Sequence, residues 1–402
     1  MAAADKRPAF EALGGKTPED LFSELPTPCY IIDEAQLHKN GRILASVAEN
    51  TGCKILLAQK AFSNYDFYPL LSGYLAGTEA SGLFEARLGA EKMPGKEVHV
   101  FCAAYTESNF DSILDYADHI VFNSPGQLKS FGPRAKKCKK SIGLRINPEC
   151  STQEGHEIYD PCSAGSRLGT TRKQWELQMT DEAASMLDGL HFHTLCEQDA
   201  DALETTLKAA EEKFGDILPK MKWLNMGGGH HITRGGYDIQ TLEKCIIGAK
   251  QKWNTDIYLE PGEACALNAG YLACRVLDIV QNGKFRIAVL DTSAACHMPD
   301  VIEMPYMPPL YGAEKGNISR HVYRLGGPTC LAGDIIGDYS LDHELKTGDL
   351  LLFGDMAIYS TCKTNTFNGM PLPNIWKRNV YGQLERLTDF GYNDFKMRLG
   401  KI

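Results

Sequence analysis

Three kinds of residue that could do chemistry follow short apolar stretches of this sequence: a lysine, a run of glycines and a glutamate. Lys60 comes just after the apolar residues 55–58, where an ammonium is costly to bury unless something uses it. A desolvated lysine has a lowered pKa, and its neutral amine can attack a carbonyl carbon. Taken alone, Lys60 is more typical of a lysine that reaches solvent from a strand end. Its partners along the chain decide between the two interpretations.

The other two features supply an anion site and a buried charge. Glycines 227–229 offer bare backbone amides, which predict an anion cradle, although a plain turn is the alternative. Glu260 ends an apolar run and is followed by Pro261, so its carboxylate is either paired or functional. Pyridoxal phosphate requires three such groups together. They are a lysine that reacts with its aldehyde, a cradle for its phosphate and a carboxylate beside its pyridine nitrogen. His193 could stack on such a ring, although alone it is more typical of a core histidine.

These residues need a frame that brings them together, and the spacing of apolar segments predicts one. Helical stretches lie between most members of a series of eight strand candidates. Those candidates are 54–59, 75–80, 97–103, 119–123, 141–147, 189–194, 222–226 and 256–260. Eight such units favour an N-terminal (β/α)8 TIM-like barrel over an open α/β sheet, which remains the alternative. Chemistry in these barrels lies at the C-terminal strand ends, where Lys60, His193, the glycines and Glu260 fall.

The pattern changes after the barrel series. Short strand candidates separated by Gly and Pro turns predict a C-terminal β-sandwich or β-barrel domain, and they are 275–281, 285–291, 322–325, 349–353 and 374–381. The predicted domains are therefore 1–33, an arm and a strand that joins the β domain; 34–272, a cofactor-binding barrel; and 273–402, the β domain. The arm itself is predicted to be a short helix or a loose segment. The long link 148–188 is predicted to be a functional loop.

Composition narrows the class of protein. A chain of 402 residues suits two domains, and a formal net charge of -9 argues against a nucleic-acid partner. Residues 1–24 lack the apolar core of a secretory signal, and no apolar run is long enough for a membrane span. The 13 cysteines contain no CxxC pair, which is typical of free thiols in a reducing cytosol. We therefore expect a cytoplasmic protein that contacts neither nucleic acid nor membrane.

Several motifs together carry a resemblance that covers residues 26–392. They are Ala58-Gln-Lys60, Ala80-Ser-Gly82, Ser166-Arg-Leu-Gly169, Phe192-His193, Met226-Gly-Gly-Gly229, Glu260-Pro-Gly262, Gly327-Pro-Thr-Cys330 with Asp334, and Asp355-Met-Ala-Ile-Tyr359. In these motifs the chain resembles the fold-type III pyridoxal-phosphate-dependent decarboxylases, the group of the ornithine, arginine and diaminopimelate decarboxylases. The resemblance implies an N-terminal barrel, a C-terminal β domain and a head-to-tail homodimer whose active sites are shared across the interface.

The resemblance also implies a role for each matching residue. Lys60 would hold pyridoxal phosphate, His193 would stack on its ring and Glu260 would meet the pyridine nitrogen. The phosphate would be held by Gly228, Gly229 and Tyr359. Cys330 would reach into the partner's active site as the proton donor, and Asp334 would contact the distal amine of the substrate there. The implied site contains no metal.

One departure from the family pattern bears on the substrate. The usual Glu-Pro-Gly-Arg motif reads Glu-Pro-Gly-Glu here, so that Glu263 replaces an arginine and favours a cation. Asp300 and Glu303 add acidic groups, unless they form a solvated rim. Glu263 and the His297-Met-Pro-Asp300 motif resemble the carboxynorspermidine/carboxyspermidine decarboxylase branch, which implies release of CO2 to give norspermidine or spermidine in polyamine biosynthesis.

Other functions remain as alternatives at this point. One is decarboxylation of another basic amino acid, namely diaminopimelate, ornithine or arginine. A second is a metal-dependent barrel hydrolase, because His191 and His193 share one face of a strand. A third is a decarboxylase-like protein that has lost its cofactor and serves as a binding partner.

Overall fold

The computed structural model describes residues 7–153, 160–315 and 321–401. The chain divides into two compact units, which are described separately: residues 39–265, and residues 1–38 together with 266–402. No helix in the described ranges is both long and apolar enough to cross a membrane.

Residues 39–265 form the predicted barrel, so the open-sheet alternative is wrong. Eight parallel strands close on themselves, because β2 pairs with β9 as well as with β3. The strands are β2 (Lys54–Ala58), β3 (Gly77–Ala80), β4 (Glu97–Phe101), β5 (His119–Phe122), β6 (Ser141–Arg145), β7 (Gly189–His191), β8 (Trp223–Asn225) and β9 (Asp256–Leu259). Each observed strand lies within its predicted segment, and several end one to three residues earlier.

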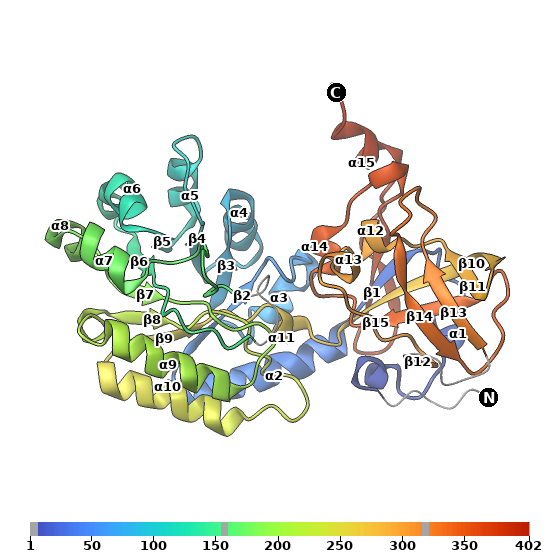
Figure 1. Cartoon of the computed structure of the whole chain (residues 1–402), viewed down its shortest axis with the longest axis horizontal. Coiled ribbons are helices and arrows are strands. Elements are labelled where there is room, and N and C mark those ends of the chain that lie inside the picture. The colour runs from blue at the N-terminus through green and yellow to red at the C-terminus, as the bar shows by residue number, and fades with distance from the viewer. Residues whose placement is uncertain (1–6, 154–159, 316–320, 402) are drawn as a thin grey trace. The chain divides into compact units, whose positions relative to one another are not determined.

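Helices surround these strands (Figure 1). They are α2 (Glu34–Thr51), α3 (Tyr68–Leu71), α4 (Leu83–Lys92), α5 (Phe110–Tyr116), α6 (Pro125–Lys137), α7 (Arg172–Gln178), α8 (Asp181–Ser185), α9 (Ala200–Phe214), α10 (Ile239–Trp253) and α11 (Glu263–Ala266). The bounds of α10 follow from its ends, because Asp238 caps its first turn and Asn254 ends it in the left-handed conformation. The link 148–188 contains α7 and α8, and its residues 154–159 lie outside the described ranges.

The second unit is built on a nine-stranded, mostly antiparallel sheet. Its order is β12-β14-β13-β11-β10-β1-β16-β17, with β15 paired to β10. The strands are β1 (Cys29–Asp33), β10 (Gly270–Asn282), β11 (Phe285–Leu290), β12 (Ala313–Lys315), β13 (His321–Gly326), β14 (Ile335–Leu341), β15 (Leu350–Gly354), β16 (Asn374–Arg378) and β17 (Leu384–Arg386). The early strand β1 lies between β10 and β16.

The first described residues are helical, which is one of the two predicted alternatives. A 3-10 helix, η1 (Pro8–Leu13), and α1 (Pro18–Phe22) precede β1. Phe10, Leu13 and Phe22 are each 1% exposed and pack in a cluster with Tyr271 of β10. Burial of these large apolar side chains fixes the segment to the β domain.

Candidate active site

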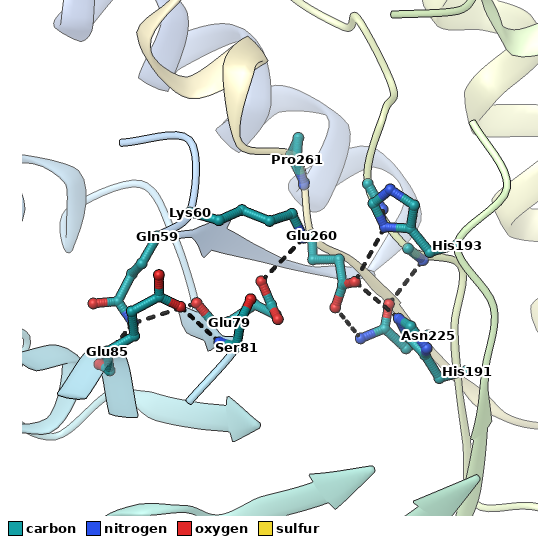
Figure 2. Close-up of polar contacts among 12 residues, drawn as sticks. Gln59, Lys60, Glu79, Ser81, Glu85, His191, His193, Asn225, Glu260 and Pro261 are labelled. Atoms are coloured by element: carbon teal, nitrogen blue, oxygen red, sulfur yellow. Dashed lines mark hydrogen bonds and ion pairs between the residues drawn. The ribbon is translucent and has the colours of Figure 1, made fainter. Parts of the chain in front are cut away.

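Lys60, His193 and Glu260 lie together at the C-terminal ends of the barrel strands (Figure 2). The amide of Gln59 donates to the carbonyl of Glu79, which sets Lys60 beside the end of β3. The amide of Ala58 donates to the carbonyl of Pro261, which sets the same turn beside Glu260 after β9. The closed barrel therefore converts positions far apart in the sequence into neighbours, as the prediction from strand ends required.

Lys60 lies on the turn after β2 with 35% of its side chain exposed. Its Nζ is 3.4 Å from Oε2 of Glu79. Burial alone lowers the pKa of Lys60, but the charges of Glu79 and Glu260 outweigh burial and raise the pKa above its ordinary value. The expectation of a lowered lysine pKa is therefore wrong, because the sequence did not identify Glu79 as a partner.

Glu79 is a site residue that sequence reasoning missed. Its side chain is buried in β3, and burial raises its pKa to about 7, with Glu260 adding to the rise and Lys60 opposing it. A carboxyl group that titrates near neutrality can hold a proton or release it at working pH. The available signal was a glutamate inside a buried strand, directly before the Ala80-Ser-Gly82 motif.

Glu260 is the fixed charge of the site. Its Oε1 accepts a hydrogen bond from Nε2 of His191 at 2.8 Å, and its Oε2 accepts one from Nδ2 of Asn225 at 2.9 Å. Burial by itself raises the pKa of Glu260, yet His191 and Lys60 outweigh it and bring the pKa well below its ordinary value. Burial also lowers the pKa of His191, so a neutral imidazole donates to an ionised carboxylate.

His193 is neutral and oriented by the glycine turn. Burial lowers its pKa to about 3, and its Nδ1 accepts a hydrogen bond from the amide of Gly228 at 3.1 Å. The same nitrogen lies 3.5 Å from Oε1 of Glu260. With Nδ1 as the acceptor, the proton of the imidazole is on Nε2.

The glycine turn after β8 needs glycine at each position. Gly227 and Gly229 have φ values of 76° and 78°, and a Cβ on Gly229 would lie 2.0 Å from the carbonyl oxygen of Leu195. The amides of Gly227 and Gly228 donate to Asn225 and His193. The amide of Gly229 donates to no group in the described part of the chain, so it is the ready anion donor of the turn.

Arg145 is a second site residue that the sequence did not reveal. Its guanidinium lies over the ring of Phe101, 4.6 Å from the ring centroid, and Nη2 donates to the carbonyl of His193 at 3.1 Å. Burial lowers its pKa to about 10, with Glu260 and Glu79 opposing the shift. Arg145 adds positive charge beside two buried carboxylates. It falls inside the predicted strand 141–147, and nothing in the sequence indicates that its side chain faces the site.

These barrel residues fit pyridoxal phosphate. Lys60 offers an amine, and Glu260 is an ionised carboxylate held in place by two donors. The Gly229 amide, which has no partner among the described residues, lies in a turn too tight for any Cβ. The negative charge of Glu260 would keep a pyridine nitrogen protonated, and the neutral ring of His193 would suit an aromatic neighbour.

The remaining predicted residues lie on different elements. Glu263 is the half-buried first residue of α11. In the β domain, Tyr359 has a φ of 55° directly before α14 (Ser360–Lys363), and Cys330 is exposed, with its amide donating to Oδ1 of Asn368.

The two aspartates predicted to bind substrate already have partners. Lys363 forms ion pairs with Asp300 and with Glu303, the latter at 2.9 Å. Asp334 is 3% exposed and accepts hydrogen bonds from side chains and amides of its own unit. A cationic substrate would have to exchange with these partners.

The histidines of the hydrolase alternative both face Glu260. Within the described residues, the three side chains that come close enough to ligate a metal are elsewhere, at the amino ends of β4 and β5: Glu97, His99 and His119. The two imidazoles stack with centroids 3.8 Å apart, and the Nε2 atoms of His99 and His119 lie 3.0 Å and 3.8 Å from Oε2 of Glu97. Lys54 already pairs with Glu97, and the outer nitrogens of both histidines lack the partner that metal-bound histidines have. This cluster is better explained as a polar plug at the base of the barrel.

Comparisons with known proteins agree with this geometry. A family model described as "Pyridoxal-dependent decarboxylase, C-terminal sheet domain" matches residues 29–357. A carboxynorspermidine/carboxyspermidine decarboxylase of Campylobacter jejuni is 42% identical over 94% of this chain and 99% of its own length. A carboxyaminopropylagmatine decarboxylase of a Synechocystis species is 41% identical over 94% of this chain and 97% of its own.

A solved structure gives the same result for the fold. The crystal structure of carboxynorspermidine decarboxylase from Campylobacter jejuni, complexed with norspermidine, superposes with a TM-score of 0.85 and 40% identity, covering 93% of this chain and 100% of that one. The chain belongs to the family of pyridoxal-dependent decarboxylases, and its cofactor is pyridoxal phosphate.

Proposed function

We propose that this enzyme removes CO2 from carboxynorspermidine or carboxyspermidine and so produces norspermidine or spermidine. The observation that carries the proposal is the fixed Glu260 carboxylate in one site with Lys60, in a chain that is 42% identical to a decarboxylase named for these substrates. Glu263, in place of the family's arginine, supports a cationic side chain in the substrate.

The residues of the barrel would divide the work as follows. Pyridoxal phosphate, when bound, supplies an aldehyde carbon for an amine and a ring that takes up the electron pair left by CO2. Lys60 anchors the cofactor through its amine, and Glu79, with its pKa near 7, takes the proton that the ammonium releases. Glu260 would hold a proton on the ring nitrogen, and His193 would lie against the ring. Cys330, which belongs to the β domain, would return a proton to the carbon that lost CO2.

The acidic groups would select the substrate. Glu263 repels a distal carboxylate, such as that of diaminopimelate, and attracts an ammonium. In the β domain, Asp300 and Glu303 hold the ammonium of Lys363 between them, so this pair has the geometry for a primary ammonium ion. We propose that a polyamine arm exchanges with Lys363 at Asp300.

A second candidate substrate has its own support. The Synechocystis relative, which is named for carboxyaminopropylagmatine, is 41% identical to this chain, nearly as similar as the relative named for carboxynorspermidine and carboxyspermidine. That compound is also a carboxylated polyamine, and it differs in ending in a guanidinium. A planar guanidinium pairs best with a carboxylate through two parallel hydrogen bonds, whereas an ammonium has no such requirement.

The assembly and location are part of the proposal. We propose a cytoplasmic homodimer in which the barrel binds the cofactor and Cys330 and Asp334 belong to segments that complete the partner's active site. Thirteen free cysteines, with no disulfide, suit a reducing compartment. Sedimentation of the holoenzyme would give the mass of a dimer.

The test uses purified holoenzyme and its Lys60→Ala variant. We expect the wild type to release CO2 from carboxynorspermidine and carboxyspermidine, and borohydride to fix pyridoxal phosphate to the peptide that contains Lys60. The variant should show neither result. A variant that kept both CO2 release and the fixed label would refute the role of Lys60. Inactivity of the loaded wild type toward both compounds, with activity toward carboxyaminopropylagmatine, would favour the second candidate.

A further inference from the structure

Asp334 lies at the centre of a closed set of hydrogen bonds in the β domain. Its Oδ1 accepts from the hydroxyl of Ser293 at 3.0 Å and from the amide of Ala295 at 3.2 Å. Its Oδ2 accepts from the hydroxyls of Ser293 at 2.9 Å and Thr329 at 2.7 Å, and the amide of Thr329 is 3.4 Å away. The hydroxyl of Ser293 has one proton, which the two oxygens share, so four donors in all reach the carboxylate, about as many as it can accept.

The packing around Asp334 also excludes a ligand. The residue is 3% exposed, and a Cβ on Gly327 would lie 2.2 Å from Oδ2. The chain therefore passes directly over the carboxylate at Gly327, where only glycine fits. A substrate ammonium could reach Asp334 only by breaking hydrogen bonds that the structure has already made.

The bonds of Asp334 join two segments that matter for the proposed reaction. Thr329 precedes Cys330, the proposed proton donor. Ser293 caps α12 (Ala294–His297), donating to Asp334 while it accepts from the amide of Cys296 at 3.2 Å. α12 continues through Met298 and Pro299 into α13 (Asp300–Glu303), which begins with the proposed substrate carboxylate. The buried carboxylate of Asp334 thus links the loop that carries Cys330 to α12, the helix directly before that of Asp300.

A second attachment fixes the same loop from its other side. The amide of Cys330 donates to Oδ1 of Asn368 at 2.7 Å. In turn, the side chain and the amide of Asn365 donate to the carbonyls of Ala295 and Cys296 on α12. The Cys330 loop and α12 are therefore bound both to each other and to the segment 365–368.

We infer that Asp334 is a positioning residue, which holds the Cys330 loop against α12, and that it is not a contact of the substrate's amine. This inference rests on the proposed role of Cys330 and replaces the role that the family resemblance implied for Asp334. The carboxylate of Asp334 fixes the position of the Cys330 thiol, and of the two groups only the thiol contacts the reacting carbon.

The experiment compares five single variants of the full-length holoenzyme and repeats Asp334→Asn in a Cys330→Ala background. Asp334→Asn, Ser293→Ala and Thr329→Ala each remove part of the hydrogen-bond set, whereas Thr329→Ser keeps the hydroxyl. Asp338→Asn is the matched control, because Asp338 pairs with Arg324 on the surface of the same sheet. Rates are referred to the folded, cofactor-loaded fraction. Hydrogen exchange is followed in the peptides that cover 293–297 and 327–334.

We expect the first three variants to lower kcat for carboxynorspermidine at least tenfold with KM changed less than threefold, and to speed exchange in both peptides. Thr329→Ser and Asp338→Asn should behave as the wild type. In a Cys330→Ala background, Asp334→Asn should lower kcat by less than twofold more, because the group that it positions is gone. A merely structural aspartate would lower kcat equally in both backgrounds.

Two results would overturn the inference. One is a tenfold rise in KM for Asp334→Asn while Ser293→Ala and Thr329→Ala keep the wild-type kcat, which is the pattern of a substrate contact. The other is unchanged hydrogen exchange in the first three variants. If the wild type released no CO2 from any carboxylated polyamine, the proposed function would fall, whereas the exchange data would still decide whether Asp334 holds the loop.

Discussion

At the scale of single residues, Glu260 keeps its charge because donors surround it. Burial opposes ionisation of a carboxyl group, but His191 and Asn225 each donate a hydrogen bond to it, and Lys60 adds a positive charge nearby. A carboxylate fixed in this way can hold a proton on a pyridine nitrogen without reorienting. The same arrangement makes Glu260 sensitive to loss of charge.

We expect Glu260→Gln to lower kcat about 10- to 100-fold, because a hydrogen bond to a charged group contributes about 1.5–3 kcal/mol. Glutamine has nearly the same size but cannot hold the ring proton by charge. The measurement is steady-state CO2 release by the loaded enzyme. Glu97→Gln is the matched control, since Glu97 also contacts a histidine but at the opposite end of the barrel. Equal losses in the two variants would argue against a special role for Glu260.

Glu263 gives the sharpest residue-level test of substrate charge. We expect Glu263→Arg to raise KM for carboxynorspermidine at least tenfold, because it replaces attraction of an ammonium by repulsion, while the affinity for pyridoxal phosphate changes little. Kinetics and dialysis of the cofactor measure the two effects. Glu263→Gln should give an intermediate KM. An unchanged KM in the arginine variant would show that Glu263 does not face the substrate.

The barrel residues that strand positions alone identified share one property: they lie just beyond the end of a buried strand. Lys60 and Glu260 could be recognised in this way. Glu79 and Arg145 lie inside strands that the sequence predicted, and a charged residue there gives no sign of which partner satisfies it. Asp334 was recognised, but its hydrogen-bond partners at 293 and 295 are distant in sequence, so its local role was not.

At the scale of elements, the turn after β8 depends on glycine. Its amides either orient site residues, as at Gly227 and Gly228, or remain available, as at Gly229. The backbone at Gly227 and Gly229 is left-handed, and neighbouring carbonyls approach too closely for a side chain. The turn can therefore present an amide to an anion, and no residue larger than glycine fits at these two positions.

We expect Gly229→Ala to weaken the binding of pyridoxal phosphate at least tenfold. The left-handed conformation costs about 1–2 kcal/mol for a residue with a Cβ, and the Cβ would also collide with Leu195. Gly82→Ala is the control, because a Cβ there meets no atom within 4 Å and the backbone is extended. Cofactor affinity is measured by equilibrium dialysis. Tight binding by the alanine variant would exclude Gly229 from the cradle.

Prediction of elements succeeded where periodicity and local signals agreed. The barrel strands are buried apolar runs, and α10 carries a cap at each end. In the β domain, β12 and β17 are only three residues long, and β14 contains Gly337 and Asp338, which are poor strand formers. Pairing with β13 makes β14 a strand, and such a partner cannot be read from the segment itself.

At the scale of the whole molecule, folding buries several histidines in the neutral state. Burial lowers the pKa to about 3 for His119 and His193 and to about 4 for His230, His231 and His297. These residues lie in both compact units. His297, for example, accepts from Thr292 at Nδ1 and contacts the carbonyl of Pro371 through Nε2. Acid should therefore destabilise the barrel and the β domain alike.

We expect the free energy of unfolding to fall as the pH drops from about 6.5 toward 4. An unfolded histidine takes up a proton near pH 6.5, whereas the folded one stays neutral until its lower pKa, so the stabilisation present above pH 6.5 is lost as the pH falls. Each histidine contributes a slope of about 1.4 kcal/mol per pH unit. Glu79 opposes this trend, because its raised pKa makes the folded state bind one proton before the unfolded state does as the pH falls.

His231 allows a clean test of that slope. Both of its ring nitrogens are buried without a hydrogen-bond partner among the described residues, so His231→Phe removes a titrating group and no hydrogen bond. Urea titrations from pH 7.5 to 5 should show a shallower loss of stability in the variant. An identical slope in the two proteins would mean that His231 titrates normally in the folded state.

The fold class follows from patterns that span the whole chain, which is why it was predictable. The choice among carboxylated polyamines depends on where a few carboxylates stand, and Lys363 shows how a resident cation can occupy a predicted substrate position. From Glu263 the sequence predicts a cationic substrate, whereas it gives no sign that Lys363 is the partner of Asp300.

The most direct measurement is a competition among substrates. Wild-type holoenzyme is given equal concentrations of carboxynorspermidine, carboxyspermidine, carboxyaminopropylagmatine, diaminopimelate, ornithine and arginine, and the amine products are quantified by mass spectrometry at early times. The account predicts that norspermidine or spermidine is the main product and that lysine, formed from diaminopimelate, is at least a hundredfold less abundant. Lysine, putrescine or agmatine as the main product would contradict it.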